Sequence, residues 1–328
     1  MMRLPPFEFL SPRSLEEAVE MKDKHGSEAM YVSGGTDLYP KMKRRQFTPK
    51  VLISLNKISE LRAVSNGNGM VIGAGLTLAE LAGHPEVIRK YPALATAAGL
   101  VSSPPLRNAG TIGGNLCVDT RCTYYDQTYA WRKALGFCLK KSGDTCWVAL
   151  SSPRCMAVSS SDCAPVAIAL GARVRLVGPE GERTVPVGAL YQNDGKEYLV
   201  KSPDEVLAAI HLPDLEGWRT AYWKLRRRGS IDFPILGVAV ALRLDGDGQC
   251  KDARIVLGAV ASQPVIADRA ASMLLGEKIS PELIEAAAQE AYRLAKPLDN
   301  TDMSLGYRKK MSRIYISGAL SEACGLQV

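Results

Sequence analysis

Short apolar runs alternate with amphipathic segments along the chain, a pattern typical of mixed α and β structure. Runs rich in Val, Ile and Leu predict strands, and segments behind a capping Ser or Thr predict helices. The predicted strands are residues 29–32, 51–55, 70–72, 173–177, 183–187, 218–228, 237–244 and 253–260. The predicted helices run from Ser14 to about Lys24, from Thr77 onward, over 92–99 and 164–170, and from Ser280 to about Leu294.

Two segments carry strong turn and loop signals. Asp245-Gly246-Asp247-Gly248 separates two apolar runs, which is typical of a β-hairpin. Residues 107–115 are rich in small side chains and predict a loop with a special backbone path. The pattern contains no internal repeat, and it fits a domain boundary near residue 215 with a smaller α+β domain behind it.

The composition predicts a folded protein with a substantial core. The chain has 328 residues, of which 46% are hydrophobic and 23% charged, and this length favours two or three domains over one. No apolar run approaches the roughly 18–20 residues needed to cross a bilayer. The first residues lack the apolar stretch of a secretory signal. We therefore expect a cytoplasmic protein that does not insert into membranes.

The net charge of +7 is modest, but basic residues gather at 41–45, 226–228 and 308–313. We expect these clusters to be solvated surface or subunit contacts. Phosphate binding and docking of an acidic partner are the alternatives. No motif supports nucleic-acid recognition, so we expect no nucleic-acid partner.

Two glycine-rich segments have a composition that suits anion binding: Ser33-Gly34-Gly35-Thr36-Asp37, directly after a predicted strand, and Gly110-Thr111-Ile112-Gly113-Gly114-Asn115. Paired glycines allow the backbone to approach a ligand and to aim successive N–H groups at one anion. Each segment alone is a weak signal, because Gly-Gly pairs are commonly turns. Together they favour dinucleotide binding.

Other common site motifs are missing from the sequence. Gly73-Ala74-Gly75 follows a predicted strand, but Leu78 breaks the G-x-G-x-x-G fingerprint. The sequence has no Walker A lysine pattern, no G-x-S-x-G elbow and no H-E-x-x-H. Its three histidines are scattered along the chain, so a histidine metal site or a catalytic triad has little to build on: His25, His84 and His211.

Six of the eight cysteines lie within one stretch of 47 residues. In a reducing compartment such a cluster is more often metal-binding or redox-active than a disulfide framework. Four of them, separated by 15, 7 and 8 residues, match neither a zinc ribbon nor a ferredoxin run: Cys122, Cys138, Cys146 and Cys155. The spacing leaves tetrahedral zinc and a [4Fe–4S] cluster open.

Two properties of residues 120–159 favour the cluster. The segment carries six aromatic residues that we expect to shield a redox centre, although they also suit a simple mini-core: Tyr124, Tyr125, Tyr129, Trp131, Phe137 and Trp147. In and beside it, Asp126 and Asp144 are outnumbered by a basic set: Arg121, Arg132, Lys133, Lys140, Lys141 and Arg154. We expect a basic face above the centre, which suits an acidic electron carrier.

Residues 33–38 match the motif A-G-G-T-D-L except for Ser33, and residues 107–115 match R-N-x-G-T-I-G-G-N. These motifs resemble those of the FAD-binding medium subunits of molybdenum hydroxylases, the group of xanthine dehydrogenase and carbon monoxide dehydrogenase. The resemblance continues through 161–165 and 222–224 and covers essentially the whole chain. It implies an α+β fold with two domains. Residues 1–215 would form a two-subdomain FAD-binding domain of the PCMH (vanillyl-alcohol oxidase-like) type. Residues 216–328 would form a smaller C-terminal α+β domain of the CO dehydrogenase flavoprotein type.

The resemblance also implies which residues contact FAD: Val32, Ser33, Gly34, Gly35, Thr36, Asp37, Leu38, Thr111, Ile112, Gly113, Gly114, Asn115, Asp162, Leu207 and Lys224. Asp162 would accept hydrogen bonds from flavin or ribitol groups, and Lys224 would place positive charge near the isoalloxazine. A helix N-cap suits Asp162 about as well, and an exposed strand position suits Lys224. Cys117 and Cys163 lie in or beside the flavin motifs, and we expect both to pack as small apolar residues.

The segment at about 120–159, with its four cysteines and the flanking residues 115–122, is similar to the β subunits of 4-hydroxybenzoyl-CoA reductases. This similarity implies that Cys122, Cys138, Cys146 and Cys155 bind a [4Fe–4S] cluster. It further implies an electron-transfer subunit. Ferredoxin would deliver electrons, and FAD would pass them to [2Fe–2S] clusters on a small subunit. A large molybdopterin-binding subunit would then remove a phenolic hydroxyl from an aromatic CoA thioester.

From the same similarity we expect a heterotrimer that dimerises, and an isolated chain without activity. Two alternatives stay open. The chain is the FAD subunit of another molybdenum hydroxylase that acts on a different aromatic or heterocyclic substrate, or it is a nucleotide-binding scaffold with structural zinc. The residues do not name the substrate, because the substrate pocket is expected on another polypeptide.

Overall fold

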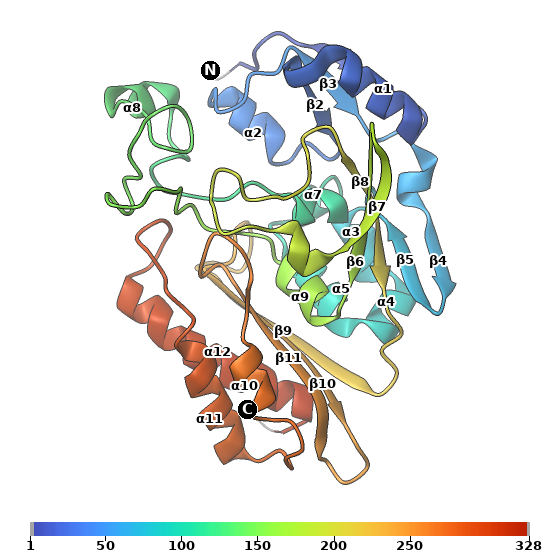
Figure 1. Ribbon diagram of the computed structural model, residues 1–328, viewed down its shortest axis with the longest axis vertical. Coiled ribbons are helices and arrows are strands. Elements are labelled where there is room, and N and C mark those ends of the chain that lie inside the picture. The colour runs from blue at the N-terminus through green and yellow to red at the C-terminus, as the bar shows by residue number, and fades with distance from the viewer. Residues whose placement is uncertain (1–2, 327–328) are drawn as a thin grey trace.

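The computed structural model describes residues 3–326, which form three β-sheets with helices packed around and between them (Figure 1). The N-terminal sheet is parallel, with strand order β1-β3-β2. The helix predicted behind Ser14 covers it, and the Ser14 hydroxyl accepts a hydrogen bond from the Glu17 N–H at 3.1 Å. The elements of this part are β1 (Glu8–Leu10), α1 (Leu15–His25), η1 (Gly26–Glu28), β2 (Ala29–Val32), α2 (Leu38–Lys43), β3 (Val51–Ser54) and η2 (Ser59–Arg62).

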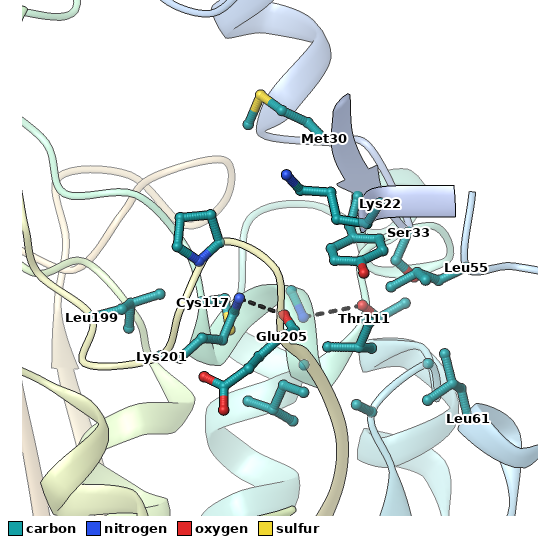
Figure 2. Close-up of a pocket in the computed structure, with 18 of the residues that line it drawn as sticks. Lys22, Met30, Ser33, Leu55, Leu61, Thr111, Cys117, Leu199, Lys201 and Glu205 are labelled. Atoms are coloured by element: carbon teal, nitrogen blue, oxygen red, sulfur yellow. Dashed lines mark hydrogen bonds between the residues drawn. The ribbon is translucent and has the colours of Figure 1, made fainter. Parts of the chain in front are cut away.

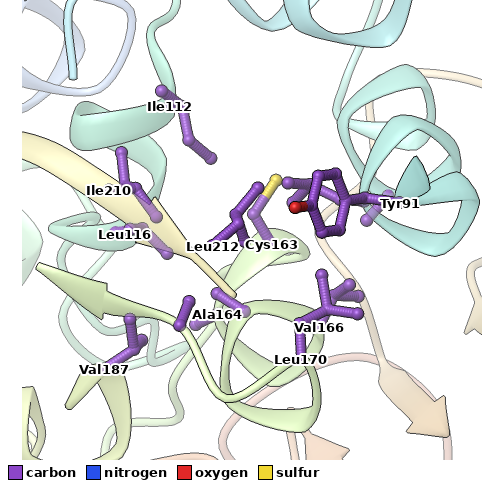
Figure 3. Packing of buried hydrophobic residues seen from close by; sticks show 14 of the residues in the cluster. Tyr91, Ile112, Leu116, Cys163, Ala164, Val166, Leu170, Val187, Ile210 and Leu212 are labelled. Carbon is purple, nitrogen blue, oxygen red and sulfur yellow. The ribbon is translucent and has the colours of Figure 1, made fainter. Parts of the chain in front are cut away.

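The second sheet is antiparallel, with strand order β4-β5-β8-β6-β7. Its central strand is almost wholly buried, because nearly every residue of the sequence VLAAIHL is apolar. Figure 3 shows the core over this sheet, where Cys163 lies between Leu212 and Tyr91. The elements are β4 (Val64–Gly67), β5 (Gly69–Gly73), α3 (Leu78–Gly83), α4 (Pro85–Lys90), α5 (Pro92–Leu100), α9 (Cys163–Ala169), β6 (Arg173–Gly178), β7 (Gly181–Pro186), η3 (Val187–Leu190) and β8 (Val206–Leu212).

The C-terminal sheet is also antiparallel, with order β12-β11-β10-β9, and its β10–β11 hairpin forms at the predicted Asp-Gly turn. Helix α12 packs on one face of this sheet, whereas α5 and α9 pack on the other. The second and third sheets therefore share one core. The elements are β9 (Trp218–Leu225), β10 (Leu236–Leu244), β11 (Cys250–Gly258), β12 (Val265–Ile266), α10 (Asp268–Ser272), α11 (Pro281–Tyr292) and α12 (Leu305–Cys324).

The segment predicted as a loop at 107–115 is partly helical. It begins at the end of α6 (Pro104–Arg107) and runs into α7 (Ile112–Leu116). Glycine-rich sequence is a poor helix former, but the Thr111 hydroxyl caps α7 by accepting from the Gly114 N–H at 3.2 Å. The Gly113 N–H also donates to the Ala74 carbonyl at 2.8 Å. Tertiary hydrogen bonds thus override a weak local preference.

The cysteine-rich segment extends away from the sheets as irregular chain with one short helix, α8 (Tyr129–Ala134), which stands apart in Figure 1. Across the described residues, no helix is long and apolar enough to traverse a bilayer. The predicted strand at 218–228 is shorter than expected, since β9 ends at Leu225. The basic clusters are not wholly surface, because Lys41 and Arg308 are buried.

Candidate functional site

The two glycine segments pack directly against neighbouring backbone. A Cβ atom on Gly34 would lie 2.0 Å from the Ala109 carbonyl oxygen, and one on Gly113 would lie 2.6 Å from the Ala74 Cβ. Among the glycines of both segments only Gly35 has a positive φ, of 68°. Close backbone approach, rather than an unusual dihedral angle, therefore requires glycine at positions 34 and 113.

A cavity of about 400 Å³ opens beside the glycine segments, between the parallel sheet and strand β8 (Figure 2). Its lining includes five of the residues that the resemblance assigns to FAD: Ser33, Thr111, Gly113, Gly114 and Leu207. A cavity of this size suits an organic cofactor. The structure thus brings residues from three distant parts of the sequence to one cleft.

The cleft also contains polar residues that sequence reasoning missed. Lys201 donates to the Glu205 carbonyl at 2.6 Å, and Lys22 donates to the Asp204 carboxylate at 2.9 Å. The sequence does hold a signal for Lys22, because this lysine continues the buried stripe of α1 that Leu15, Ala18 and Val19 begin. The sequence gives no comparable signal for Lys201.

Cys117 lines the cleft as well, and burial raises the pKa of its thiol. It is half-buried at the edge of the second-sheet core, whereas Cys163 is fully buried within it. The prediction that both pack as small apolar residues therefore holds for Cys163, but Cys117 also faces the cavity.

The other assigned loop residues make contacts within the protein. Val32 and Ile112 belong to hydrophobic cores. The Asn115 side-chain oxygen accepts hydrogen bonds from the Ser161 hydroxyl at 2.7 Å and from the Cys163 N–H at 3.1 Å. Thr36 lies beside Gly110, Gly35 lies against the Tyr39 ring, Leu38 begins α2, and Asp37 pairs with Arg121.

Asp162 and Lys224 form a closed buried pair between α9 and β9. The Asp162 carboxylate accepts from the Tyr222 hydroxyl at 2.8 Å and from the Lys224 ammonium at 3.0 Å. Lys224 also donates to the carbonyls of Leu100 and Asp232. Burial raises the pKa of the Asp162 carboxyl, and the lysine charge opposes that rise.

These contacts correct two interpretations of the pair: a side-chain cap for Asp162 and an exposed strand position for Lys224. Asp162 does not cap α9 with its side chain, because Ser161 accepts from the Ala164 N–H instead. Lys224 is not an exposed strand residue, since its side chain is completely buried and has three acceptors within the protein. The lysine charge is therefore fixed by the protein itself.

Cys122, Cys138, Cys146 and Cys155 are all buried and line one small cavity together with Tyr125 and Trp147. Burial raises the pKa of the Cys122 thiol to about 12 and that of Cys155 to about 11. Backbone N–H groups oppose these shifts, and the Ala157 N–H donates to the Cys155 sulfur at 3.4 Å. Within residues 3–326, no three His, Cys, Asp or Glu side chains are close enough to hold a single metal ion.

Five of the six aromatic residues divide into two sets. Tyr125 is buried beside the cysteines, and Tyr124 and Trp147 pack against them. Tyr129 and Trp131 are instead 45% and 40% exposed on α8. Only part of the aromatic set therefore shields the cysteines.

Half of the residues predicted to form an exposed basic face are not exposed. Arg132 and Lys140 are buried, and Arg121 is largely buried against Asp37 and Asp126. The exposed basic residues of the segment are Lys133, Lys141 and Arg154. Long cationic side chains turn inward here because acceptors from other parts of the chain surround them.

The cysteine-rich segment is anchored on three sides. The Gln46 side chain donates to the Tyr125 carbonyl at 2.8 Å, and Asn300 donates to the Met156 carbonyl at 2.7 Å. The Gly195 N–H donates to the Cys155 carbonyl at 2.8 Å. These anchors come from the loop after α2, from the loop before β8 and from the loop before α12, so three distant segments hold the cysteine-rich segment.

Residues 5–215 match the family described as FAD binding domain in molybdopterin dehydrogenase. The chain belongs to this family. Residues 220–323 match a second family, the CO dehydrogenase flavoprotein C-terminal domain. The predicted fold, an FAD-binding domain followed by a smaller C-terminal α+β domain, is thereby confirmed.

Relatives extend over nearly the full length of this FAD-binding subunit. It is 31% identical to the carbon monoxide dehydrogenase medium chain of Hydrogenophaga pseudoflava, over 97% of each chain. It is 34% identical to the aldehyde oxidoreductase FAD-binding subunit of Escherichia coli, over 72% of this chain and 76% of that one. The solved carbon monoxide dehydrogenase from Hydrogenophaga pseudoflava superposes with a TM-score of 0.82 at 30% identity, covering 99% of each chain.

The comparisons assign the general role of the chain. The protein is the FAD-binding medium subunit of an oxidoreductase of the molybdenum hydroxylase family.

Proposed function

We propose that this medium subunit carries electrons between FAD in the glycine-loop cleft and a [4Fe–4S] cluster held by Cys122, Cys138, Cys146 and Cys155. The observation that carries the proposal is the convergence of these four buried thiols, from 34 residues of chain, on one cavity. We place the boundary between the flavin and C-terminal domains at residues 215 and 216, and the inserted iron–sulfur module at about 120–159. The whole chain would be cytoplasmic, in keeping with eight free cysteines.

The flavin cleft fits its proposed cofactor. The cofactor contacts would come from residues 32–38 and 111–115 together with Asp162, Leu207 and Lys224. The buried Asp162–Lys224 pair would also fix the adjacent backbone. Gly34 and Gly113 keep the loops close to the cleft because they lack a Cβ. FAD exchanges one or two electrons, so it suits a subunit that links one-electron clusters to two-electron chemistry elsewhere.

We favour a cluster over a single zinc ion in the cysteine cavity. Tetrahedral zinc, with Zn–S distances of about 2.3 Å, needs its four sulfurs about 3.8 Å apart. No group of three His, Cys, Asp or Glu side chains in residues 3–326 is gathered tightly enough for one ion. A cubane cluster holds its thiolates farther apart, because an iron atom lies behind each sulfur. N–H groups aimed at Cys122 and Cys155 also favour thiolate ligands.

The proposal extends to the partner subunits, the electron donor and the substrate. The subunit would bind a large molybdopterin-binding subunit and a small [2Fe–2S] subunit in a heterotrimer that dimerises, and ferredoxin would supply electrons. The reaction would be reductive dehydroxylation of an aromatic CoA thioester, as in 4-hydroxybenzoyl-CoA reductases. The similarity of the cysteine-rich segment supports this choice.

The second candidate is the FAD subunit of a molybdenum hydroxylase that acts on another substrate. The comparisons support this candidate better than the first, because the chain is similar to carbon monoxide dehydrogenase and aldehyde oxidoreductase chains. The two candidates differ in the substrate reduced or oxidised by the assembled complex. Anaerobic assay of that complex with reduced ferredoxin and 4-hydroxybenzoyl-CoA separates them: formation of benzoyl-CoA supports the first, and no turnover supports the second.

The proposed cluster can be tested on this chain purified by itself. Anaerobically purified protein should contain FAD and four iron atoms, with an iron–sulfur signal in electron paramagnetic resonance after reduction. Cys138→Ala should lose the cluster and keep FAD, whereas Cys324→Ala, at a position that does not line the cavity, should keep both. Zinc without iron in the unaltered protein, or loss of flavin with retention of iron in Cys138→Ala, would contradict the proposal.

A further inference from the structure

Three cations surround one buried aromatic ring beside the cysteine cavity. The ammonium groups of Lys140 and Lys41 lie 5.1 and 5.2 Å from the centre of the Tyr125 ring, and the Arg132 guanidinium carbon lies 5.7 Å from it. The Tyr125 ring itself packs with Cys122 and Cys138. The ring thus contacts both a group of cations and two of the proposed cluster ligands.

The charge in this group is unbalanced. Lys41, Arg132 and Lys140 are 0%, 2% and 8% exposed, and the buried carboxylate among them is Asp119. Asp119 pairs with both lysines, and its bond with Lys140 measures 2.7 Å. Arg132 donates to the carbonyls of Arg44 and Gln127. The buried group therefore has two positive charges more than negative ones.

The nearby partly exposed charges do not remove this excess. Asp126 is 22% exposed at its side chain, and Arg121 and Arg44 both lie within 4.0 Å of it. Asp37 is paired with Arg121. Uncompensated buried cations are costly in a medium of low dielectric constant. A cluster bound by four thiolates carries net negative charge and would supply the missing anion.

We propose that Lys140, supported by Lys41 and Arg132, stabilises the reduced state of the cluster and so sets its reduction potential. This inference rests on the proposed function. One electron from a reduced iron–sulfur protein would make the cluster one unit more negative, and no proton moves. The fixed positive charge stabilises that added negative charge, with little screening by solvent because the lysine is buried. Lys140 would act through its charge, because its side chain lines the cysteine cavity.

Lys140 should have the larger effect of the two lysines, because it lines the cysteine cavity and Lys41 does not. The shared carboxylate limits the structural damage that these substitutions cause, although Lys140 also donates to the Thr120 hydroxyl. Replacing either lysine by methionine leaves Asp119 paired with the other, so neither variant strands a buried carboxylate. Lys133 lies exposed on α8 in the same module and provides the matched control.

The test is a redox titration of the cluster in the full-length protein, purified anaerobically and followed by electron paramagnetic resonance. Lys140→Met should lower the midpoint potential, Lys41→Met should lower it by less, and Lys140→Arg and Lys133→Met should leave it near the unaltered value. If Lys140→Met does not fold, the Lys41→Met shift decides the question.

Equal potentials in all variants that retain iron would overturn the inference and leave the proposed function intact. A drop in stability with no change in potential would overturn it in the same way, because a purely structural lysine predicts that result. Absence of iron from the unaltered protein would overturn both the cluster and this role of Lys140.

Discussion

The Lys224 ammonium lies 3.0 Å from the Asp162 carboxylate and joins the flavin domain to the C-terminal sheet across 62 residues of sequence. Both side chains are buried, and Tyr222 supplies a further hydrogen bond to the carboxylate. The pair therefore fixes the N-terminus of α9 against β9, next to the second glycine segment, where Asn115 bonds to Ser161 and Cys163.

Lys224→Met should destabilise the protein by about 3–5 kcal/mol, because it leaves a buried carboxylate without its cation. Urea unfolding at neutral pH measures the loss. The double variant Asp162→Asn with Lys224→Met should lose less than Lys224→Met alone, since no charge remains to be buried. A loss below about 1 kcal/mol, the range of exposed ion pairs, would show that the pair is not closed as described.

Gly34→Ala should destabilise the flavin domain by about 1–3 kcal/mol and reduce its flavin content, because the new methyl group meets a backbone carbonyl that cannot move aside. Gly83→Ala is the matched control, since a Cβ at that position has no neighbour within 4 Å. Its stability should change by no more than about 0.5 kcal/mol. Thermal unfolding and the flavin absorbance of purified variants test both; full flavin occupancy in Gly34→Ala would contradict the close approach.

Thr111→Val should cost about 1 kcal/mol, because the Gly114 N–H loses its cap at the start of α7. Thr111→Ser keeps an oxygen at the same place and should retain most of the stability. Since α7 lines the cleft, FAD affinity measured by fluorescence should fall in the valine variant and recover in the serine variant. Equal affinity in both would mean that the cap does not support the cofactor loop.

We expect the Glu205 carboxyl, which lies at the cleft, to make the stability of the protein sensitive to acid. Its hydrogen bonds from Arg183 lower the pKa of its carboxyl from the ordinary value of 4.5. A carboxyl with a lowered folded-state pKa stabilises the protein above its unfolded pKa, and this stability is lost as pH falls through the folded pKa.

Below about pH 4.5 the free energy of unfolding should therefore fall more steeply in the unaltered protein than in Glu205→Gln. Urea unfolding over a series of acidic pH values measures the slopes. Glu216→Gln, at an exposed position, should follow the unaltered protein. Identical slopes for Glu205→Gln and the unaltered protein would remove Glu205 as a source of the acid sensitivity.

Local signals in the sequence determined much of the secondary structure. Ser14, Thr77 and Ser280 cap helices as predicted, and the Asp-Gly turn joins β10 to β11. Each of these features depends on side chains within four residues, which a linear pattern records. The glycine motifs likewise resemble those of the correct family, and their paired glycines suit a backbone that approaches a ligand closely.

Tertiary structure alone decided which charged side chains are buried and where the short helices form. Lys41 pairs with Asp119 across 78 residues and Arg121 with Asp37 across 84, so one residue of the basic run and part of the expected basic face lie in buried networks. Helix α7 forms from glycine-rich sequence because Ala74 and Leu76 supply hydrogen-bond acceptors from another segment. The sequence determined which residues carry charge or thiols. The packing of distant segments decided which of them face solvent, and no local pattern records such contacts because they depend on long-range chain folding.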